Sequence, residues 1–369
     1  MTTSPTIRLL ALLAGLALVL ACAGPSGSPP PTDIAASSTT LPASPTDVPA
    51  NPTASPASPT AGPTGGLSVV TSTTVLADLV RQVGGDRVSV ESLMPAGRDP
   101  HTFEPSPGDA ARLAGADLLV MNGLGLDEWL EDLALDAADG VPLVAVAEDL
   151  PGAEYLEGGE HAHGDEDDED HHDEGDEDHG DEDHGDEDHG DEDDHDHAVN
   201  PHLWLDVANA RLYVERLAEV LTANDEAGRA AYEANAATYD ATLAELDGWI
   251  REQIDSTPAE NRRVVSFHDA FPYLAHAYGL EIVGVVVESP GQEPSAAEVA
   301  RLITAIREAG VRAVLTEVQF DDRLAQVIAD EAGVSVVDQL FTDSLGEPPL
   351  DTYEAAMRWN VERIVAGLR

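Results

Sequence analysis

The 369-residue sequence contains no lysine and a single cysteine. All 18 basic residues are arginines, and 71 acidic residues give a formal net charge of −53 at pH 7. Nucleic-acid binding and docking on an anionic lipid surface both require clustered basic residues, so this charge balance argues against both kinds of partner. The single cysteine excludes a disulfide framework and a zinc ribbon.

The N-terminal residues 1–21 have the pattern of an export signal, because one arginine precedes an apolar run that is too short to span a membrane. Cys22 follows this run, and its setting resembles a bacterial lipobox, although Leu20 is bulkier than usual there. An ordinary cleaved signal is the alternative. We predict that Cys22 is lipidated and that 22–66, rich in Pro, Ser and Thr, is a tether. The body would then be held on the extracytoplasmic face of a bacterial cell membrane.

Short apolar runs alternate with segments of helical periodicity in both halves of the remaining chain. The first half has strand-like runs at 67–72, 88–94, 116–121 and 141–147, and helical segments at 75–83, 109–113 and 127–135. The second half has runs at 264–267, 282–287, 313–316 and 334–337, and helical segments at 269–278, from 295 onward, 323–332 and 353–368. This alternation predicts an α/β fold with two βα lobes, each built on a parallel sheet.

A long helix is predicted between the two lobes. Apolar residues recur every three or four positions from Tyr232 to Ile254, and neither proline nor glycine interrupts positions 229–247. A helix over 227–254 would form a rigid joint about 40 Å in length. The expected divisions are an N-terminal lobe at 67–224, a connecting helix at 225–256 and a C-terminal lobe at 257–369.

Three histidines occupy turn-rich positions near predicted strand or helix ends. His101 lies in a loop after a strand, His202 precedes a helix and His268 directly follows a strand. Prolines before the first two stiffen their loops. A single histidine of this kind is usually a surface or hydrogen-bonded residue, but three at such positions indicate a binding site, because ligands bind beyond the carboxyl ends of parallel strands. His276, inside a predicted helix, is expected to be an ordinary structural residue.

The sequence around these histidines resembles the zinc/manganese solute-binding lipoproteins of metal-uptake ABC transporters, a family also described as adhesin-like receptors. The resemblance extends over 67–369, and the segments that carry it are 99–105, 200–206, 267–271, 316–320, 341–345 and 357–360. Asn200 and Val207 depart from the family pattern, which more often has Asp and Pro there.

The resemblance implies that one metal ion binds to His101, His202, His268 and Asp343 in the cleft between the lobes. Three imidazole nitrogens and one carboxylate oxygen suit Zn²⁺ in a tetrahedral shell. Manganese receptors of the family typically have a carboxylate at the third position, so His268 favours zinc, with Mn²⁺ as the alternative. Glu104 and Glu317 are alternative fourth donors, or partners that orient the histidines.

Residues 160–197 form a run of histidine and acidic residues in which Asp-Glu-Asp-His-Gly recurs. The run has too few apolar residues to fold alone. Many divalent ions accept mixed imidazole and carboxylate donors, so we interpret the run as a low-affinity metal collector, with a solubilising loop as the alternative. Its histidines are His161, His163, His171, His172, His179, His184, His189, His195 and His197.

The function implied by the resemblance is capture of Zn²⁺ by a monomeric receptor and its delivery to a cognate ABC permease. We expect release when a small shift separates His101 and His202 from His268 and Asp343. A manganese receptor and an extracellular metal buffer or adhesin are alternatives. A zinc hydrolase is not expected, since the sequence has neither a His-Glu-x-x-His nor a Gly-x-Ser-x-Gly motif.

Overall fold

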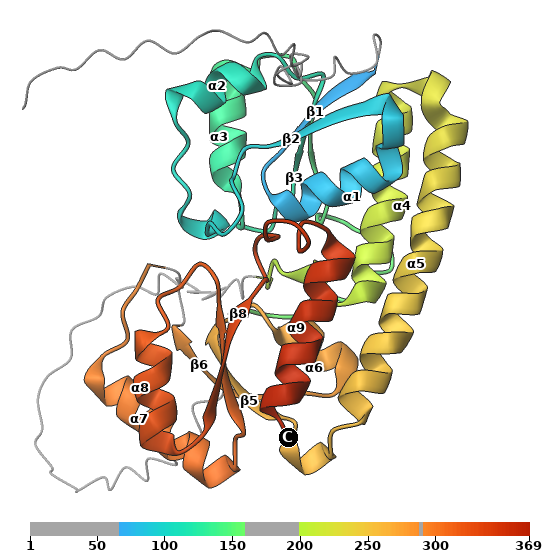
Figure 1. Ribbon diagram of the computed structural model, residues 1–369. Helices are drawn as coiled ribbons and strands as arrows, with labels where there is room; N and C mark the ends of the chain where they lie inside the picture. Colours follow the sequence, from blue (N-terminus) through green and yellow to red (C-terminus); the bar gives the residue numbers. More distant parts are fainter. Residues whose placement is uncertain (1–65, 159–198, 288–290) are drawn as a thin grey trace, which may run out of the picture. The chain divides into compact units, whose positions relative to one another are not determined.

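The computed structural model describes residues 66–158, 199–287 and 291–369 (Figure 1). The predicted export signal, Cys22, the tether up to residue 65 and the acidic run 160–197 lie outside these residues.

Two four-stranded parallel sheets form the framework, which confirms the predicted α/β fold. The strand orders are β2-β1-β3-β4 and β6-β5-β7-β8, so both halves have the same topology. The strands are β1 Leu67–Thr71, β2 Val88–Ser92, β3 Leu118–Met121, β4 Leu143–Ala145, β5 Arg263–His268, β6 Glu281–Val287, β7 Ala313–Glu317 and β8 Ser335–Leu340.

Helices connect the strands and cover the sheets. The α-helices are α1 Thr74–Gly84, α2 Pro107–Leu113, α3 Glu128–Ala137, α4 Val207–Asn224, α5 Arg229–Asp255, α6 Pro272–Tyr278, α7 Ala296–Ala309, α8 Arg323–Ala332 and α9 Tyr353–Gly367. Short 3-10 helices are η1 Gly85–Arg87, η2 Pro100–Thr102, η3 Leu203–Leu205, η4 Glu226–Gly228 and η5 Ala259–Asn261. Among the described residues, no helix combines the length and the apolar character needed to cross a membrane.

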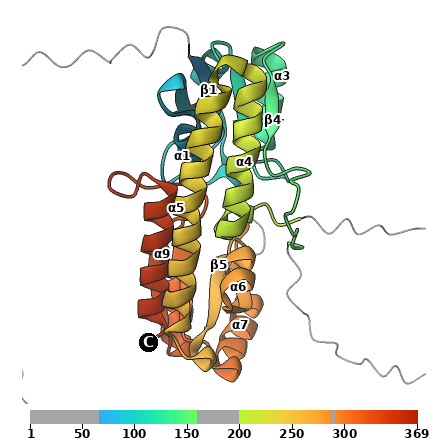
Figure 2. The same cartoon turned by 90° about the vertical axis from the view of Figure 1, so that its right-hand side faces the viewer.

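The predicted long helix is α5, with 27 residues. Every buried residue of α5 belongs to the apolar stripe seen in the sequence: Tyr232, Ala236, Tyr239, Leu243, Leu246, Ile250 and Ile254. The 18-residue helix α4 packs along α5, and α9 packs along it as well (Figure 2). The periodicity therefore identified the buried face of α5, whereas its pairing with α4 and α9 is a tertiary feature.

One buried apolar cluster extends through both halves of the protein. It contains Val69 of the first sheet, Val264 of the second sheet and the buried stripe of α5. Two smaller clusters fill the opposite faces of the sheets, beneath α2 and α3 in the first half and beneath α7 and α8 in the second. Because the halves share close-packed apolar contacts, a large displacement of one against the other would expose core surface to water, and only small displacements are expected.

Candidate metal centre

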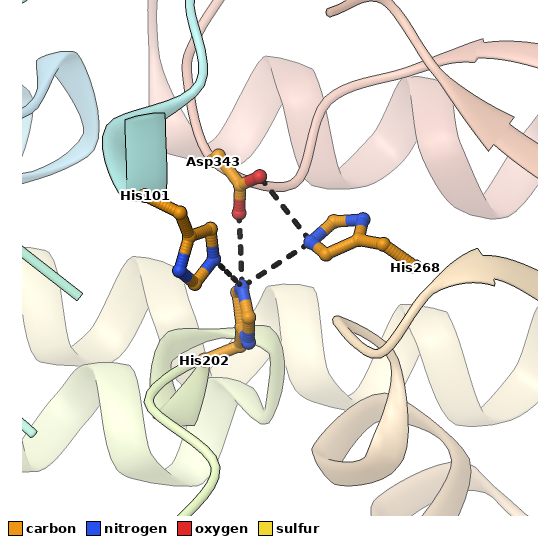
Figure 3. Close-up of side chains that lie close together, drawn as sticks. All are labelled: His101, His202, His268 and Asp343. Carbon is orange, nitrogen blue, oxygen red and sulfur yellow. Dashed lines mark hydrogen bonds and ion pairs between the residues drawn. The ribbon is translucent and has the colours of Figure 1, made fainter. Parts of the chain in front are cut away.

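The four side chains predicted as metal ligands meet at one point (Figure 3). His101 lies within η2 after β2, His202 immediately precedes η3, His268 is the last residue of β5 and Asp343 follows β8. One potential ligand atom from each lies within 4.8 Å of the others. His101 is partly exposed, and the other three are buried.

The separations of three donor atoms from His202 Nε2 are close to the edge length of a small tetrahedral shell. His202 Nε2 lies 3.3 Å from His101 Nε2, 3.4 Å from His268 Nε2 and 3.1 Å from Asp343 Oδ1. Asp343 Oδ2 lies 3.3 Å from His268 Nε2. An ion bound at about 2.0–2.1 Å in a tetrahedron needs donors about 3.3–3.4 Å apart, since the edge of a tetrahedron is about 1.63 times its centre-to-corner distance. The three separations from His202 Nε2 are close to this value, and the limit of 4.8 Å for the whole set is compatible with closure of all four groups around one such ion.

Oxygen acceptors fix the orientation of two of the imidazole rings. His202 Nδ1 lies 3.0 Å from Asn200 Oδ1, and His268 Nδ1 lies 2.8 Å from Glu317 Oε1. Each Nδ1 must donate a proton in such a contact, so the lone pair of the neutral ring is on Nε2. Both lone pairs then point towards the Asp343 carboxylate and the shared centre. A cation at this point would stabilise the arrangement.

The loop that carries His101 is ordered by local hydrogen bonds. Asp99 Oδ1 accepts from the backbone N–H of His101 at 2.9 Å, and Asp99 Oδ2 accepts from the Thr102 hydroxyl at 3.0 Å. The Trp129 indole N–H donates to the backbone carbonyl of Pro100 at 3.0 Å. These contacts hold the imidazole at the end of β2 without the support of a longer helix.

Asn200 connects the loops of two histidines. Its Oδ1 accepts from the backbone N–H of His202 at 3.1 Å, in addition to facing the ring. Its Nδ2 donates to the backbone carbonyl of Asp269 at 2.7 Å, one residue after His268. Asn122 Nδ2 supports the same loop by donating to the carbonyl of Pro201 at 3.0 Å. The amide of Asn200 therefore fixes the position of His202 relative to the end of β5.

Burial and nearby charges shift the pKa values of the cluster. Burial lowers the pKa of His101 to about 4, so this ring is neutral at physiological pH. Burial also disfavours the charged form of His268, but Glu317 and Asp343 outweigh it and raise the pKa of His268 to about 9. Although burial opposes its ionisation, the surrounding histidines, chiefly His268, hold the pKa of Asp343 below its usual range. The protein without metal therefore holds a proton on His268 at neutral pH, and a bound cation would displace it.

The two glutamates considered as alternative donors lie in different places. Glu317 is buried, and its Oε1 contacts the outer nitrogen of His268, which is the position of an orienting partner. Glu104 is exposed and does not belong to the group of potential ligands. His276, expected to be an ordinary residue, is exposed on α6 and is also outside the group. The histidines of the acidic run lie outside the described residues.

Two contacts of the ligands were not foreseen from the sequence. Asn200 was noted only as a departure from the family pattern, and Gln319 was not singled out. Gln319 Nε2 donates to Asp343 Oδ2 at 2.7 Å. The contact of Asn200 could have been predicted from the sequence, because Asn and Asp side chains often accept a hydrogen bond from the backbone N–H two residues later, as Asp99 also does here. No such local signal exists for Gln319, whose partner is 24 positions away.

A cavity of about 830 Å³ lies beside the cluster. Its walls include Asp99 and Thr102, which flank His101, and Gln319 and Phe320 at the end of β7. The Phe320 ring contacts the His268 ring at a centroid distance of 5.1 Å. His101, the one partly exposed member of the cluster, lies in sequence between Asp99 and Thr102 of the cavity wall, so we expect an ion to approach from this side.

A family model described as ZnuA, the periplasmic component A of a zinc-uptake complex, matches residues 69–367. The manganese-binding lipoprotein MntA of Halalkalibacterium halodurans is 30% identical over 305 residues, which are 82% of this chain and 89% of that protein. The manganese ABC transporter substrate-binding lipoprotein PsaA of Streptococcus pneumoniae is 27% identical over 320 residues, with the same two coverages of 82% and 89%. The solved structure of the periplasmic zinc-binding protein TroA from Treponema pallidum has a TM-score of 0.68 and 25% identity, covering 82% of this chain and 99% of that one.

Proposed function

We propose that the chain, which belongs to the family of the periplasmic zinc-uptake complex component A, captures Zn²⁺ outside the cytoplasmic membrane for import. The relatives MntA and PsaA are metal-binding or metal-transporter lipoproteins by name, and the chain is accordingly a metal substrate-binding protein of an ABC transporter. Members of this family are solute-binding receptors, so the protein is not an enzyme.

The observation that carries the zinc proposal is the donor set at tetrahedral spacing. His202 Nε2 lies 3.1–3.4 Å from a donor atom of each of His101, His268 and Asp343, and one donor atom from each of the four groups lies within 4.8 Å of the others. Zinc takes four nitrogen and oxygen donors in this geometry, and a nitrogen-rich site binds zinc more tightly than manganese in the usual order of divalent ions. TroA, with a similar structure, is described as zinc-binding, which supports the same choice.

Manganese is the second candidate. MntA and PsaA carry manganese in their names, and MntA is 30% identical to this chain. A manganese receptor would be expected to use more oxygen donors than the single carboxylate of Asp343. The fold does not distinguish a zinc receptor from a manganese receptor, so the preferred ion is identified by competition between Zn²⁺ and Mn²⁺ for the site.

The decisive experiment is the metal content of protein purified without chelator, followed by competition between Zn²⁺ and Mn²⁺ for the emptied site. We expect about one tightly bound zinc in the wild type and in His276→Ala, and none in His268→Ala. Manganese bound in preference to zinc by the wild type would contradict the zinc proposal. Many weak ions without a tight one would favour a metal buffer.

We propose that the acidic run 160–197 collects metal near the site. Glu157 and Val199, on either side of the run, pair as an antiparallel bridge, and Val199 is close in sequence to His202. The described residues on either side of the run therefore lie together, and Val199 is three positions before His202. Deletion of 160–197 should keep one tight zinc and remove several weaker sites in calorimetry, with loss of the tight site as the contrary result.

We propose that Cys22 carries the lipid anchor and that an ABC permease receives the ion, which the names of the lipoprotein relatives support. A single-chain receptor is sufficient for this role, since all four donors come from one chain. Mass determination of the membrane-extracted protein would test the lipid. An unmodified Cys22 in mature protein would contradict the anchor.

The contacts of the Asp343 loop suggest a different release step from the one expected from the sequence. The Gly97 N–H donates to the Ser344 hydroxyl, and the Leu345 N–H donates to the Thr74 hydroxyl. Both partners belong to the first half of the chain. We therefore propose that the Asp343 loop stays with the first half, and that the shell opens by withdrawal of His268 from the other three donors, which breaks the hydrogen bond from Gln319 to Asp343.

A further inference from the structure

The end of β7 contributes no metal ligand, yet it contacts two of them. In the sheet β7 lies between β5, which carries His268, and β8, which leads to Asp343. Glu317, its last residue, contacts His268 Nδ1 at 2.8 Å. Gln319, two residues later, donates to Asp343 Oδ2 at 2.7 Å. One strand end therefore supports the ligands of both neighbouring strands.

The two carboxylate oxygens of Asp343 have different surroundings. Oδ2 accepts the short hydrogen bond from the Gln319 amide. Oδ1 is buried, has no hydrogen-bond donor among the described residues and lies 3.1 Å from His202 Nε2. His202 Nδ1 faces Asn200, so Nε2 is the ring nitrogen that faces Oδ1, and a proton or a metal ion can bridge these two atoms. One acceptor site of Oδ2 is therefore taken by Gln319, whereas Oδ1 has no amide donor and is the oxygen more available to a metal ion.

The orientation of the Gln319 amide follows from its neighbours. A carboxylate can only accept, so the NH₂ group must face Asp343, and Nε2 also lies 3.4 Å from the Thr342 hydroxyl. The amide is on the wall of the cavity beside the cluster. For Oδ2 to bind a metal as well, this hydrogen bond would have to weaken and a partly positive N–H group would lie next to the cation.

We infer that Gln319 is a positioning residue that makes Asp343 bind the metal through Oδ1 alone. Gln319 thereby favours an ion that binds only four donor atoms. The inference rests on the proposed capture of a divalent metal at this site. Zinc accepts three nitrogens and one oxygen, whereas manganese prefers a larger, oxygen-rich shell that a bidentate carboxylate would help to supply. Gln319 thus selects against manganese without touching the metal.

The test is Gln319→Met, which keeps a similar volume and removes the donor, with Val318→Ala as the matched control on the same loop. We expect the variant to lose about 10–100-fold in zinc affinity, the usual effect of removing a partner of a metal ligand, while manganese affinity changes little or rises. The Zn²⁺/Mn²⁺ affinity ratio should therefore fall at least about tenfold. Val318→Ala should leave the ratio unchanged.

The visible absorption of bound Co²⁺ reports the number of donor atoms around the metal, and a general loss of stability would not change it. Four-coordinate Co²⁺ absorbs visible light more strongly than five- or six-coordinate Co²⁺. The Co²⁺ form of Gln319→Met should absorb more weakly than the wild type because Asp343 becomes bidentate. An unchanged spectrum, together with equal losses of zinc and manganese affinity, would overturn the inference.

A second variant covers the case in which Gln319→Met does not fold. Gln319→Asn keeps the amide but shortens the side chain by one methylene, so it should lower the affinity ratio in the same direction. The results also separate this inference from the proposed function. A wild type that prefers manganese would refute the zinc cargo, whereas the cobalt spectra of wild type and variant would still decide the role of Gln319.

Discussion

Glu317 illustrates how a residue outside the metal shell controls a ligand. It is buried, contacts the outer nitrogen of His268 and raises the pKa of that ring. Its own pKa is raised by burial, although His268 opposes this effect. Each group therefore favours the charged form of the other, and the contact between them fixes the orientation of the His268 ring.

Replacing Glu317 with glutamine should lower zinc affinity by about 10–100-fold, since the amide keeps the hydrogen bond but removes the charge that makes His268 a stronger donor. Competition with a chromophoric chelator measures the change. Glu104→Gln is the control, because Glu104 is exposed and outside the group of ligands. An equal loss in both variants would show that Glu104 also takes part in the shell.

Zinc binding should become tighter as the pH rises. The pKa of His268 is raised to about 9 in the protein without metal, so the ring is protonated below that pH and must lose its proton when zinc binds. Affinity should therefore increase about tenfold per pH unit between about pH 6.5 and 8 from this group. The pKa of His101 is lowered to about 4, so that ring adds no proton in this range.

Calorimetry in buffers of different ionisation enthalpy measures the proton directly. We expect about one proton released per zinc at pH 7 in the wild type and less in Glu317→Gln, whose His268 lacks the neighbouring charge. Equal proton release in the two proteins would contradict the role given to Glu317.

The residues of the candidate site differ in how far the sequence alone could identify them. The structure brings together His101, His202, His268 and Asp343, the set that the family resemblance implies. The sequence left two roles open for Glu317, as a fourth metal donor or as a partner that orients a histidine. The choice depends on which nitrogen of the His268 ring the carboxylate faces. The hydrogen bond from Gln319 to Asp343 joins separate strand ends, and no local pattern in the sequence encodes it.

At the scale of secondary structure, α5 shows what periodicity can and cannot provide. Its buried stripe is the one predicted, because burial on a helix follows the 3.6-residue repeat. The same stripe does not reveal that α4 and α9 cover it or that one apolar cluster joins both sheets. The residues that meet across this cluster are distant in sequence, and many apolar pairs would satisfy the pattern equally well.

Gly248 of α5 is exposed, and a Cβ added there would meet nothing within 4 Å. Gly248→Ala should therefore increase the free energy of unfolding by about 0.5–1 kcal/mol, because alanine restricts the unfolded chain and favours the helix. Urea unfolding followed by circular dichroism measures the change.

Gly84 in α1 is the matched contrast. A Cβ there would lie 2.1 Å from Val88 Cγ2, so Gly84→Ala should destabilise the protein, by about 1–3 kcal/mol. If both substitutions changed stability in the same direction, the packing described for these two helices would be wrong.

At the scale of the whole described body, the loop at 342–345 connects the two halves. The hydroxyls of Thr74 and Ser344 each accept a backbone N–H across this junction, and the Trp204 indole N–H donates to the carbonyl of Thr342. Asp343 is held from both sides, by these contacts and by Gln319. Any motion that opens the site must strain or break some of these bonds.

The double variant Thr74→Val/Ser344→Ala should release zinc faster. Each lost hydrogen bond weakens the loop by about 1 kcal/mol, so the dissociation rate should rise about 5–30-fold. Stopped-flow mixing with a chelator measures the rate. Thr238→Val, on the exposed face of α5, is the control. An unchanged rate in the double variant would mean that the Asp343 loop does not hold the ion.

The donor atoms join parts of the chain as far apart as positions 101 and 343. A chain with one cysteine has no internal disulfide, so the cargo itself serves as a removable cross-link between distant segments. At free zinc about 1,000-fold above the dissociation constant, this linkage adds about 4 kcal/mol to the stability of the folded state. Delivery of the ion removes that support, so we expect the emptied receptor to be the form that proteases degrade. Metal supply would in this way set the lifetime of the receptor as well as its occupancy.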